Sequence, residues 1–348
     1  MRAMTVIPGR PDSAELSELP NPQPKDGELL VEPLYLGVCG TDREIIEGGH
    51  GEPPPGRERL LLGHELLARV KQGGAGFEPG QLVAAIVRRP DPVPCACCAQ
   101  GEWDMCRNGQ YTERGIKGLD GYGAELVTLE ADFAVPIPDE LGTFGVLTEP
   151  SSILAKAWEQ IERISRRACS AHERVLVTGG GPIGLLAALM GAQRGLEVHV
   201  LDRSTEGPKP EAVHALGAQY HAGDIAEVAE EVQADVVVEC TGVAELVAGA
   251  MQHTAPGAIV CLAGVASSRT LSVDVGALNN ELVLENDVVF GSVNANRRHF
   301  EQAVASLREA DPDWLGRLIT RKVPLERWTE ALQKHDEDIK VVVEFAQR

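Results

Sequence analysis

The first part of the chain alternates short apolar runs with turn-forming residues. Apolar and β-branched residues gather at 29–34, 66–71, 82–87 and 124–129, and clusters of Gly and Pro separate these runs. Short runs bounded by such clusters are typical of strands. The pattern therefore predicts an irregular, β-rich domain over residues 1–150.

From about residue 145 the pattern changes. Apolar positions at helical spacing run through 145–165, and a short apolar strand pattern follows at 174–178. A glycine-rich turn, a helical run at 185–190 and a strand pattern at 197–201 come next. Further strand patterns lie at 235–239, 258–263 and 287–290, a helical stretch at 298–309 and a last strand pattern at 341–345. Strands that alternate with helical segments indicate a parallel, doubly wound sheet, which we predict for 151–293.

The glycine-rich turn carries the pattern G-x-G-x-x-G at Gly179, Gly181 and Gly184. It follows a strand, opens a helix and precedes a second strand that ends at Asp202, 18 residues past Gly184. This context favours dinucleotide binding over a plain strand–turn–helix. Gly179 permits the tight turn, Gly181 lets the backbone approach the diphosphate, and Gly184 lets the helix pack on the strand. The residues expected at the diphosphate, beside the positive end of the helix, are Gly179, Gly181, Pro182, Ile183 and Gly184.

Asp202 bears on the choice of cofactor. A carboxylate at this position accepts hydrogen bonds from the ribose hydroxyls and repels a 2′-phosphate, which favours NAD over NADP. The adjacent Arg203 is either a solvent-facing charge or a partner for that phosphate. We therefore predict that NAD is preferred and that NADP can also be used.

Length, charge and cysteine content narrow the function further. A chain of 348 residues is long for a single core, and a formal net charge of −20 argues against nucleic-acid binding. The chain has neither an apolar run of roughly 18 residues nor the apolar core of a signal peptide at its start, so we expect a cytoplasmic protein without a membrane span. Four of the eight cysteines fall within 95–106, which favours a metal site over disulfides.

Two further motifs precede the dinucleotide unit, namely Cys39-Gly-Thr-Asp42 and Gly63-His64-Glu65. With these motifs the chain resembles the zinc-containing medium-chain dehydrogenases over nearly its whole length. The resemblance implies a GroES-like catalytic domain, to which 294–348 return, and a Rossmann cofactor domain. It also implies a catalytic zinc bound by Cys39 and His64, with Glu65 as a further ligand or a nearby carboxylate. A homo-oligomer, either a dimer or a tetramer, is expected on the same ground.

Within the family, the segment around Glu149 resembles the one that supplies a third ligand in the glucose dehydrogenases. The alternative for Glu149 is an acid that interacts with the start of a helix. Family members with a structural zinc carry four cysteines in one lobe, but Pro92 occupies the first of these positions here. The expected ligands of the structural zinc are Cys95, Cys97, Cys98 and Cys106, the alternative being free thiols without metal. Cys169, Cys240 and Cys261 are interpreted as core or edge residues.

Several segments resemble the archaeal-type glucose (aldose) dehydrogenases in particular, among them Arg88-Arg89-Pro90, the run 111–116 and Gly291-Ser-Val-Asn294. The resemblance implies sugar contacts from Thr41, Glu113, Glu149 and Asn294. The alternatives are a surface charge for Glu113 and a turn residue for Asn294. The residues expected to meet the cofactor at later strand ends are Thr241, Ala263, Gly264, Val265, Ser292 and Asn294.

The reaction that this resemblance implies is oxidation of an aldose, D-glucose, at C1 to the lactone, with hydride transfer to NAD(P). The predicted catalytic residues are Cys39, Thr41, His64, Glu65 and Glu149, with Thr41 or a zinc-associated carboxylate as the proton relay. The nearest alternative is another polyol or secondary-alcohol dehydrogenase of the same fold. A zinc-free enone reductase would not require the ligand set, and a non-catalytic cofactor-binding protein is the remote alternative.

Overall fold

The computed structural model describes residues 1–169, 172–265 and 270–345 and divides into two compact units. Unit 1 comprises Met1–Ser152 together with Asn294–Arg348, and unit 2 is Ile153–Val293. The first division falls inside helix α2 (Thr148–Ser165). The sequence had placed the corresponding boundaries at 150 and 293. Among the described residues, no helix is both long and apolar enough to cross a lipid bilayer.

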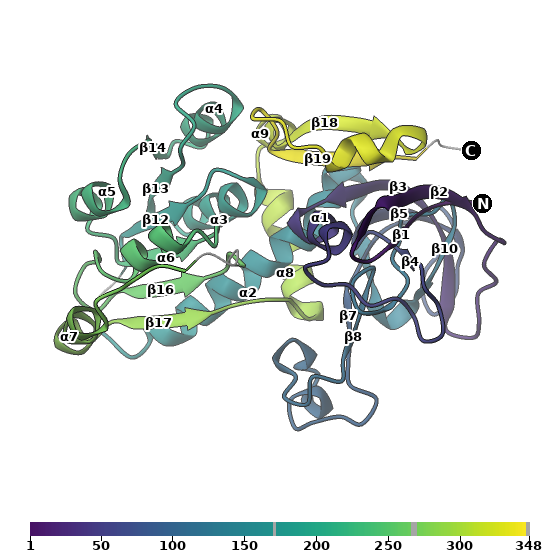
Figure 1. The fold of residues 1–348 in the computed structure, drawn as a ribbon, viewed down its shortest axis with the longest axis horizontal. Coiled ribbons are helices and arrows are strands. Elements are labelled where there is room, and N and C mark those ends of the chain that lie inside the picture. Colours follow the sequence, from purple (N-terminus) through teal and green to yellow (C-terminus); the bar gives the residue numbers. More distant parts are fainter. Residues whose placement is uncertain (170–171, 266–269, 346–348) are drawn as a thin grey trace. The chain divides into compact units, whose positions relative to one another are not determined.

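Unit 1 is built from short strands in three sheets (Figure 1). The largest has the order β11-β6-β5-β3-β19-β18, with β10 also paired to β3; the others are β2-β1-β4 and β7-β8-β9. The strands are β1 (Arg2–Ile7), β2 (Arg10–Glu18), β3 (Glu28–Val38), β4 (Leu60–Leu61), β5 (Glu65–Gln72), β6 (Leu82–Ala85), β7 (Arg88–Arg89), β8 (Thr112–Arg114), β9 (Gly118–Leu119), β10 (Val127–Glu130), β11 (Ala134–Ile137), β18 (Ile319–Pro324) and β19 (Lys340–Glu344). The last strand of the chain thus lies inside the sheet, antiparallel to β3.

The helices of unit 1 are short, and its hydrophobic core lies between the sheets. The α-helices are α1 (Gly40–Glu47), α8 (Arg297–Glu309) and α9 (Pro312–Leu318), and the 3₁₀ helices are η1 (Cys98–Gln100), η2 (Trp103–Met105), η3 (Ala131–Phe133), η4 (Asp139–Leu147) and η5 (Leu325–Leu332). The segment between β7 and β8, which carries η1 and η2, projects below these two strands in Figure 1. We call residues 90–111 the lobe.

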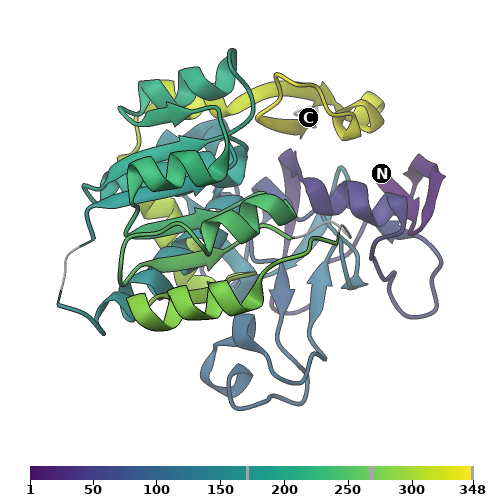
Figure 2. The ribbon, with the colours of Figure 1, turned by 60° about the vertical axis from the view of Figure 1, so that its left-hand side comes forward.

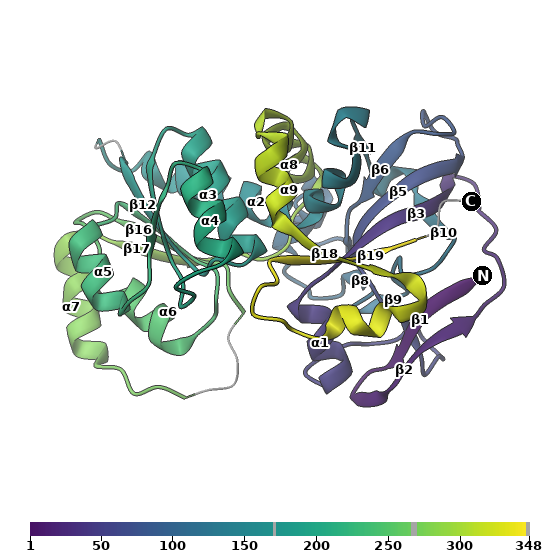
Figure 3. The same cartoon turned by 90° about the horizontal axis from the view of Figure 1, so that it is seen from above.

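Unit 2 is a parallel sheet in the order β14-β13-β12-β15-β16-β17, which is the doubly wound order of a Rossmann domain. Its strands are β12 (Arg174–Thr178), β13 (Glu197–Leu201), β14 (Gln219–His221), β15 (Val236–Glu239), β16 (Ile259–Leu262) and β17 (Val288–Gly291). Its helices, besides most of α2, are α3 (Pro182–Gln193), α4 (Pro208–Ala215), α5 (Ile225–Val232), α6 (Ala244–Ala250) and α7 (Val275–Glu285). Figures 2 and 3 show helices against both faces of the sheet, with α3 and α4 opposite α5.

Burial explains why the central strands of unit 2 form. Val236, Val237 and Val238 of β15 are fully buried, as expected for a parallel strand covered by helices on both faces. The three isolated cysteines differ in their environment. Cys261 of β16 is buried and Cys240 is partly buried, but Cys169 is exposed, so the interpretation of Cys169 as a core or edge residue is wrong. It lies in the turn that follows α2, where its neighbours Ala168 and Arg167 are also exposed.

Candidate active site

Three potential metal ligands of unit 1 converge at the end of β3 and the start of β5. The Cys39 thiol, one imidazole nitrogen of His64 and one carboxylate oxygen of Glu65 all lie within 4.8 Å of one another. Cys39 caps α1 directly after β3, and Glu65 begins β5 opposite Gly37 of β3. The Cys39 Sγ and His64 Nε2 atoms are 3.2 Å apart. Antiparallel pairing of β3 with β5 therefore assembles residues that are 25 positions apart in sequence.

The carboxylate of Asp42 lies beside the His64 ring. Its Oδ1 atom lies 3.5 Å from His64 Nδ1, and its Oδ2 atom accepts a hydrogen bond from the Cys39 backbone N–H at 2.9 Å. A carboxylate on one ring nitrogen leaves the other available to a metal. Burial by itself would lower the pKa of His64, but the nearby Cys39 and Asp42 side chains raise it well above its ordinary value. This environment stabilises positive charge, as a cation site must.

Glu65 is paired with a buried lysine. The side chains of Lys340 and Glu65 are 1% and 3% exposed and form an ion pair, and Lys340 Nζ also donates to the Val38 carbonyl at 3.2 Å. Lys340 is the first residue of β19, which delivers it to this position from the far end of the sequence. The pair compensates the charge of a carboxylate that is otherwise removed from water.

Glu149 lies in the first turn of α2 and is buried, outside the group formed by Cys39, His64 and Glu65. Burial raises the pKa of its carboxyl to about 7. The charge of His64 opposes this rise, whereas the charge of Glu65 adds to it. These electrostatic partners indicate that Glu149 lies near the group formed by Cys39, His64 and Glu65. Its assignment as a third ligand stays a prediction. Thr41, in the first turn of α1, is partly buried.

The two other predicted sugar-binding residues contact each other. Asn294 donates from Nδ2 to Glu113 Oε1 at 2.7 Å, and its own Oδ1 accepts from the Ala295 N–H at 2.9 Å. Asn294 has a positive φ of 62°, a conformation that asparagine tolerates better than most residues. Glu113 is therefore neither an isolated surface charge nor far from Asn294, although the two are 181 positions apart in sequence.

In the lobe, the structure brings together three of the four predicted cysteine ligands. The thiols of Cys95, Cys98 and Cys106 lie within 4.8 Å of one another, and Cys97 is outside this group. The prediction of Cys97 as a ligand is therefore not met, because side chains of adjacent residues diverge and Cys98 takes the inward position. The Arg107 backbone N–H donates to Cys95 Sγ at 3.4 Å. This bond, with further N–H groups of Cys98 and Cys97, lowers the pKa of the Cys95 thiol to about 6, which favours the thiolate that a metal binds.

In unit 2 the glycine-rich turn has the geometry that each glycine was expected to provide. Gly179 has a positive φ of 98°, and a Cβ on Gly184 would lie 1.8 Å from the Gly179 carbonyl oxygen. A Cβ on Gly181, by contrast, would have nothing within 4 Å, so the backbone is open there to a ligand. Pro182 is the first residue of α3, and Ile183 follows it. The turn therefore leads into the N-terminus of α3, the end of a helix that favours an anion.

Asp202 already has partners within the protein. Its Oδ2 accepts from the Gly180 N–H at 2.7 Å, and its Oδ1 accepts from the Ser204 N–H at 3.1 Å and lies 3.5 Å from Lys209 Nζ. Burial would raise the pKa of Asp202, but these donors lower it, so the carboxylate is ionised at neutral pH. Arg203 is exposed. Lys209 is thus a second cation beside the position where a 2′-phosphate would lie, which the sequence did not single out.

One buried residue, Glu239, accepts hydrogen bonds from the ends of β12, β15 and β16 in unit 2. Glu239, the fully buried last residue of β15, accepts at Oε1 from the Thr178 hydroxyl at 3.2 Å and from the Thr241 N–H at 2.7 Å. Its backbone carbonyl accepts from the N–H groups of Ala263 and Gly264 at 2.8 and 2.9 Å. Among the other predicted cofactor residues, Ser292 is buried, whereas Val265 is 73% exposed.

Comparison with known proteins agrees with this architecture along the whole chain. Residues 25–139 match the alcohol dehydrogenase GroES-like domain, and residues 142–345 match the glucose dehydrogenase C-terminus. Glucose 1-dehydrogenases of Methanocella arvoryzae and Thermoproteus tenax are 41% and 42% identical, with 99% of each chain covered. A structure of Haloferax mediterranei glucose dehydrogenase in complex with NADP, Zn and gluconolactone superposes with a TM-score of 0.93 at 33% identity and full coverage of both chains.

The chain belongs to the glucose dehydrogenase branch of the zinc-type medium-chain dehydrogenases. The resemblance seen in the sequence motifs is thereby confirmed, as is the fold class of a GroES-like domain with a Rossmann domain. Zinc and a nicotinamide cofactor are shared properties of this glucose dehydrogenase branch. The preference for NAD stays a prediction.

The residues of this glucose dehydrogenase fit the two implied groups. A thiolate, an imidazole whose second nitrogen faces a carboxylate, and a further carboxylate form a donor set suited to zinc. The open backbone at Gly181 fits a diphosphate. Four further residues at these sites, to which the sequence motifs assigned no role, are Asp42, Lys340, Lys209 and Glu239. Asp42 had a local signal, since it stands three residues after Cys39 in a capping position, and Glu239 is an acid that closes an apolar strand.

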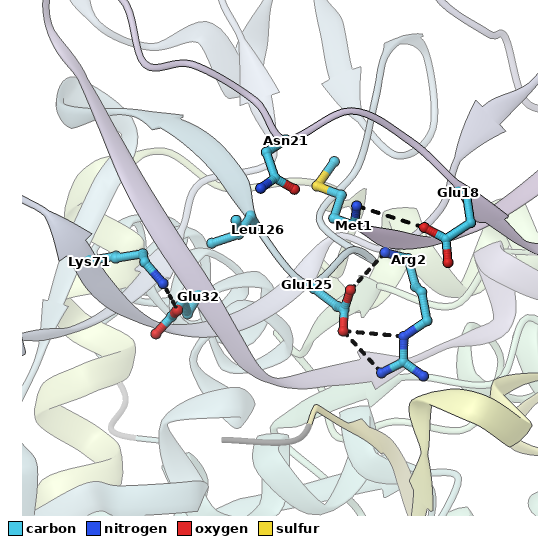
Figure 4. A pocket seen from close by; sticks show the side chains of 8 residues that line it. All are labelled: Met1, Arg2, Glu18, Asn21, Glu32, Lys71, Glu125 and Leu126. Atoms are coloured by element: carbon cyan, nitrogen blue, oxygen red, sulfur yellow. Dashed lines mark hydrogen bonds and ion pairs between the residues drawn. The ribbon is translucent and has the colours of Figure 1, made fainter. Parts of the chain in front are cut away.

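A pocket of about 330 Å³ in unit 1 is lined mainly by charged side chains and lies apart from the predicted site residues (Figure 4). Its charged side chains pair within the rim: Arg2 with Glu125, Lys71 with Glu32, and the amino group of Met1 with Glu18. None of the predicted site residues lines it. Since its charges neutralise one another, this pocket does not compete with the metal-ligating group as the place of reaction.

Proposed function

We propose that this protein is a zinc-dependent glucose 1-dehydrogenase, which oxidises the C1 hydroxyl of D-glucose to the lactone and passes the hydride to NAD(P)⁺ with release of a proton. The observation that carries the proposal is the group formed by Cys39, His64 and Glu65 in a chain of the glucose dehydrogenase branch. The Haloferax mediterranei relative, which binds NADP, Zn and gluconolactone, supports the choice of substrate.

The side chains have separate tasks in this reaction. When bound, zinc supplies a Lewis acid for the C1 hydroxyl oxygen, and the nicotinamide supplies the hydride acceptor. Cys39 and His64 hold the metal, Asp42 keeps the His64 ring oriented, and Glu65 and Glu149 are further proposed ligands. Glu113 and Asn294 are proposed to bind sugar hydroxyls. Thr41 or one of the carboxylates near the metal takes the proton on its way to solvent.

A substrate panel tests the proposed reaction. Zinc-loaded enzyme is assayed with aldoses, polyols and secondary alcohols, each with NAD and with NADP. We expect D-glucose to have the highest kcat/KM and Cys39→Ser to abolish turnover. Preference for a polyol or a secondary alcohol would instead favour the other dehydrogenases of this fold, and undiminished turnover of Cys39→Ser would reject the zinc mechanism.

We propose that NAD is preferred and NADP is also accepted. The ionised Asp202 supports the preference, because it repels a 2′-phosphate, while Lys209 beside it offers that phosphate a partner. A higher kcat/KM with NADP than with NAD would contradict the proposed preference. Lys209→Ala should selectively raise the KM for NADP, and an equal effect on both cofactors would remove Lys209 from the discrimination.

For the lobe we propose a structural zinc to which Cys95, Cys98 and Cys106 provide three of the four ligands that such a site requires. The adjacent Cys97 and Cys98 provide a matched pair for testing it. Metal analysis should give two zinc ions per chain for the unaltered protein and for Cys97→Ser, and one for Cys98→Ser. One zinc per chain in the unaltered protein would leave the lobe without metal, as a set of free thiols.

A homo-oligomer located in the cytoplasm completes the proposal. Strand β17 lies at the edge of its sheet, and Val275, Val283 and Leu284 of the neighbouring helix α7 are 65–79% exposed. An open strand edge beside exposed apolar side chains supports an interface between two copies. Light scattering coupled to size exclusion should give the mass of a dimer or a tetramer, and a monomer would contradict this part. Cell fractionation tests the location.

A further inference from the structure

Strand register in the small sheet of unit 1 places a buried arginine opposite the proposed sugar-binding carboxylate. In the antiparallel pair β7–β8, Arg88 is the direct partner of Glu113, and Arg89 is the partner of Thr112. Directly opposed residues of an antiparallel pair point to the same face of the sheet. The Arg88 and Glu113 side chains are only 6% and 12% exposed, so they form an ion pair that is largely shielded from water.

Three donors converge on one oxygen of Glu113. Arg88 donates from Nε at 3.0 Å, its Nη2 lies at 3.0 Å, and Asn294 donates from Nδ2 at 2.7 Å, all to Oε1. Within the described part of the chain, no side chain or backbone group donates a hydrogen bond to Oε2. The carboxylate is thus held by one oxygen, and the other is left to accept a hydrogen bond from a ligand.

Arg88 is itself held in place from two sides. Its guanidinium lies over the Tyr111 ring, 3.6 Å from the centroid, and Nη1 donates to the Asp104 carbonyl of the lobe at 3.4 Å. Stacking and a fixed fork of donors leave the guanidinium little freedom, which a lysine would not reproduce. The neighbouring Arg89 serves a different purpose, since it pairs with Glu130 at 2.7 Å and lies over Phe133.

We propose that Arg88 is a positioning residue for sugar recognition: it holds Glu113 by Oε1 so that Oε2 accepts a hydrogen bond from a hydroxyl other than the one at C1. The inference rests on the proposed glucose oxidation and deepens it. An ionised carboxylate can only accept, so it selects a substrate group that donates. A sugar that lacks the contacted hydroxyl leaves the carboxylate partnerless and is discriminated against.

Deoxyglucoses test this assignment. The kcat and KM of zinc-loaded enzyme are measured with glucose and with its 2-, 3-, 4- and 6-deoxy forms. We expect one deoxy sugar to lose about tenfold or more in kcat/KM in the unaltered enzyme. In Arg88→Lys this discrimination falls to a few-fold and the KM for glucose rises, while the KM for the cofactor and the zinc content stay unchanged.

Two further variants separate positioning from a general loss of structure. Arg89→Lys removes the same chemical group one residue away, and it should lower the melting temperature but keep the discrimination. The double variant Arg88→Lys/Glu113→Gln should discriminate no less than Glu113→Gln alone, because both substitutions act through the same oxygen.

Three outcomes would overturn the proposal: full discrimination in folded Arg88→Lys, equal loss in Arg89→Lys, or additive losses in the double variant. If Arg88→Lys does not fold, Tyr111→Leu replaces it, since that change removes the stacking surface and should weaken the same discrimination. An unaltered enzyme that oxidises no aldose would instead refute the proposed function, so the two failures can be told apart.

Discussion

At the scale of single residues, a glycine decides how the carboxylate of Glu65, a proposed metal ligand, lies. Gly37 stands opposite Glu65 in the register of β3 and β5. A Cβ at this position would be 1.9 Å from Glu65 Oε2 and 2.9 Å from Lys340 Cε, both shorter than a van der Waals contact. The buried ion pair of Glu65 with Lys340 therefore exists because residue 37 has no side chain.

Replacing Gly37 by alanine should displace Glu65 and weaken zinc binding. We expect Gly37→Ala to reduce zinc affinity by about tenfold or more, measured by competition with a chromogenic chelator. Gly40→Ala, three residues away at the start of α1, is the control, since a Cβ there has nothing within 4 Å and should leave zinc affinity unchanged. Equal zinc affinity in the two variants would show that Glu65 does not depend on the space at residue 37.

A second prediction concerns acid stability. Burial would raise the pKa of Glu130, but hydrogen bonding from Arg89 and the charges of Arg89 and Arg114 lower it from 4.5 to about 2. Because the pKa is lower in the folded state, the group stabilises the fold above pH 4.5 and this contribution is lost as the pH falls towards 2. Glu130→Gln should lower the free energy of unfolding at pH 7 by about 1–2 kcal/mol, allowing for partial exposure of the side chain.

Urea unfolding of the two proteins at several pH values measures this difference. The stability curves should converge between pH 4.5 and 2, where the unaltered protein loses the contribution of Glu130. Curves that stay parallel over this interval would mean that Glu130 is not responsible for the pH dependence.

At the scale of elements, the strand ends of unit 2 are tied together by Glu239. This residue closes β15, and its carboxylate and carbonyl accept hydrogen bonds from the last residue of β12 and from the segments that follow β15 and β16. These segments carry the residues proposed to meet the cofactor. The strand has a second carboxylate at its opposite end, where Asp235 accepts from the N–H groups of Glu173 and Arg174 at 2.9 and 2.8 Å.

The two carboxylates should differ in their effect on cofactor binding. Glu239→Gln leaves a side-chain N–H facing other donors, so we expect the Kd for NADH to rise by about tenfold in a fluorescence titration. Asp235→Asn disturbs the other end of β15 and should lower stability with little change in Kd. Similar Kd values for NADH in the two variants would show that Glu239 contributes to stability and not specifically to cofactor binding.

The main strands of both units could be predicted from the sequence, since the runs at 29–34, 66–71 and 82–87 fall on β3, β5 and β6, whereas the shortest strands of unit 1 could not. The predicted strands at 174–178 and 197–201 coincide with β12 and β13, because buried strands next to a glycine turn have a strong local pattern. Strands such as β7, β9 and β18 were not predicted. They are two to six residues long and are formed by pairing with distant partners rather than by their own pattern.

The same distinction applies to the candidate site. Cys39 and His64 belong to short motifs, and the structure brings them together. The partners that orient the site are remote in sequence: Lys340 reaches Glu65 from 275 positions away, and Asn294 reaches Glu113 from 181. Cys97 was predicted as a ligand of the structural zinc because the number and spacing of cysteines do not show on which side of a turn each thiol lies. Arg88 was recognised only as part of a motif, since its partner depends on strand register.

At the scale of the whole molecule, charge is unbalanced. The formal net charge is −20, because 52 Asp and Glu residues stand against 32 Lys and Arg residues. Mutual repulsion of like charges destabilises a compact state and is screened by salt. The melting temperature should therefore rise by a few degrees as NaCl is increased from about 0.02 to 0.5 M, measured by calorimetry. A melting temperature that falls with salt would show that attractive pairs dominate instead.

The position of β19 has a consequence for how the protein is made. This strand lies between β3 and β18 in the largest sheet of unit 1, although β3 is translated near the start of the chain and β19 at residues 340–344. Unit 2 is one continuous stretch and emerges complete from the ribosome while β3 still has an open edge. Biosynthesis therefore imposes an order in which unit 1 closes last. The same step delivers Lys340, so Glu65 receives its countercharge only after all of unit 2 has been translated.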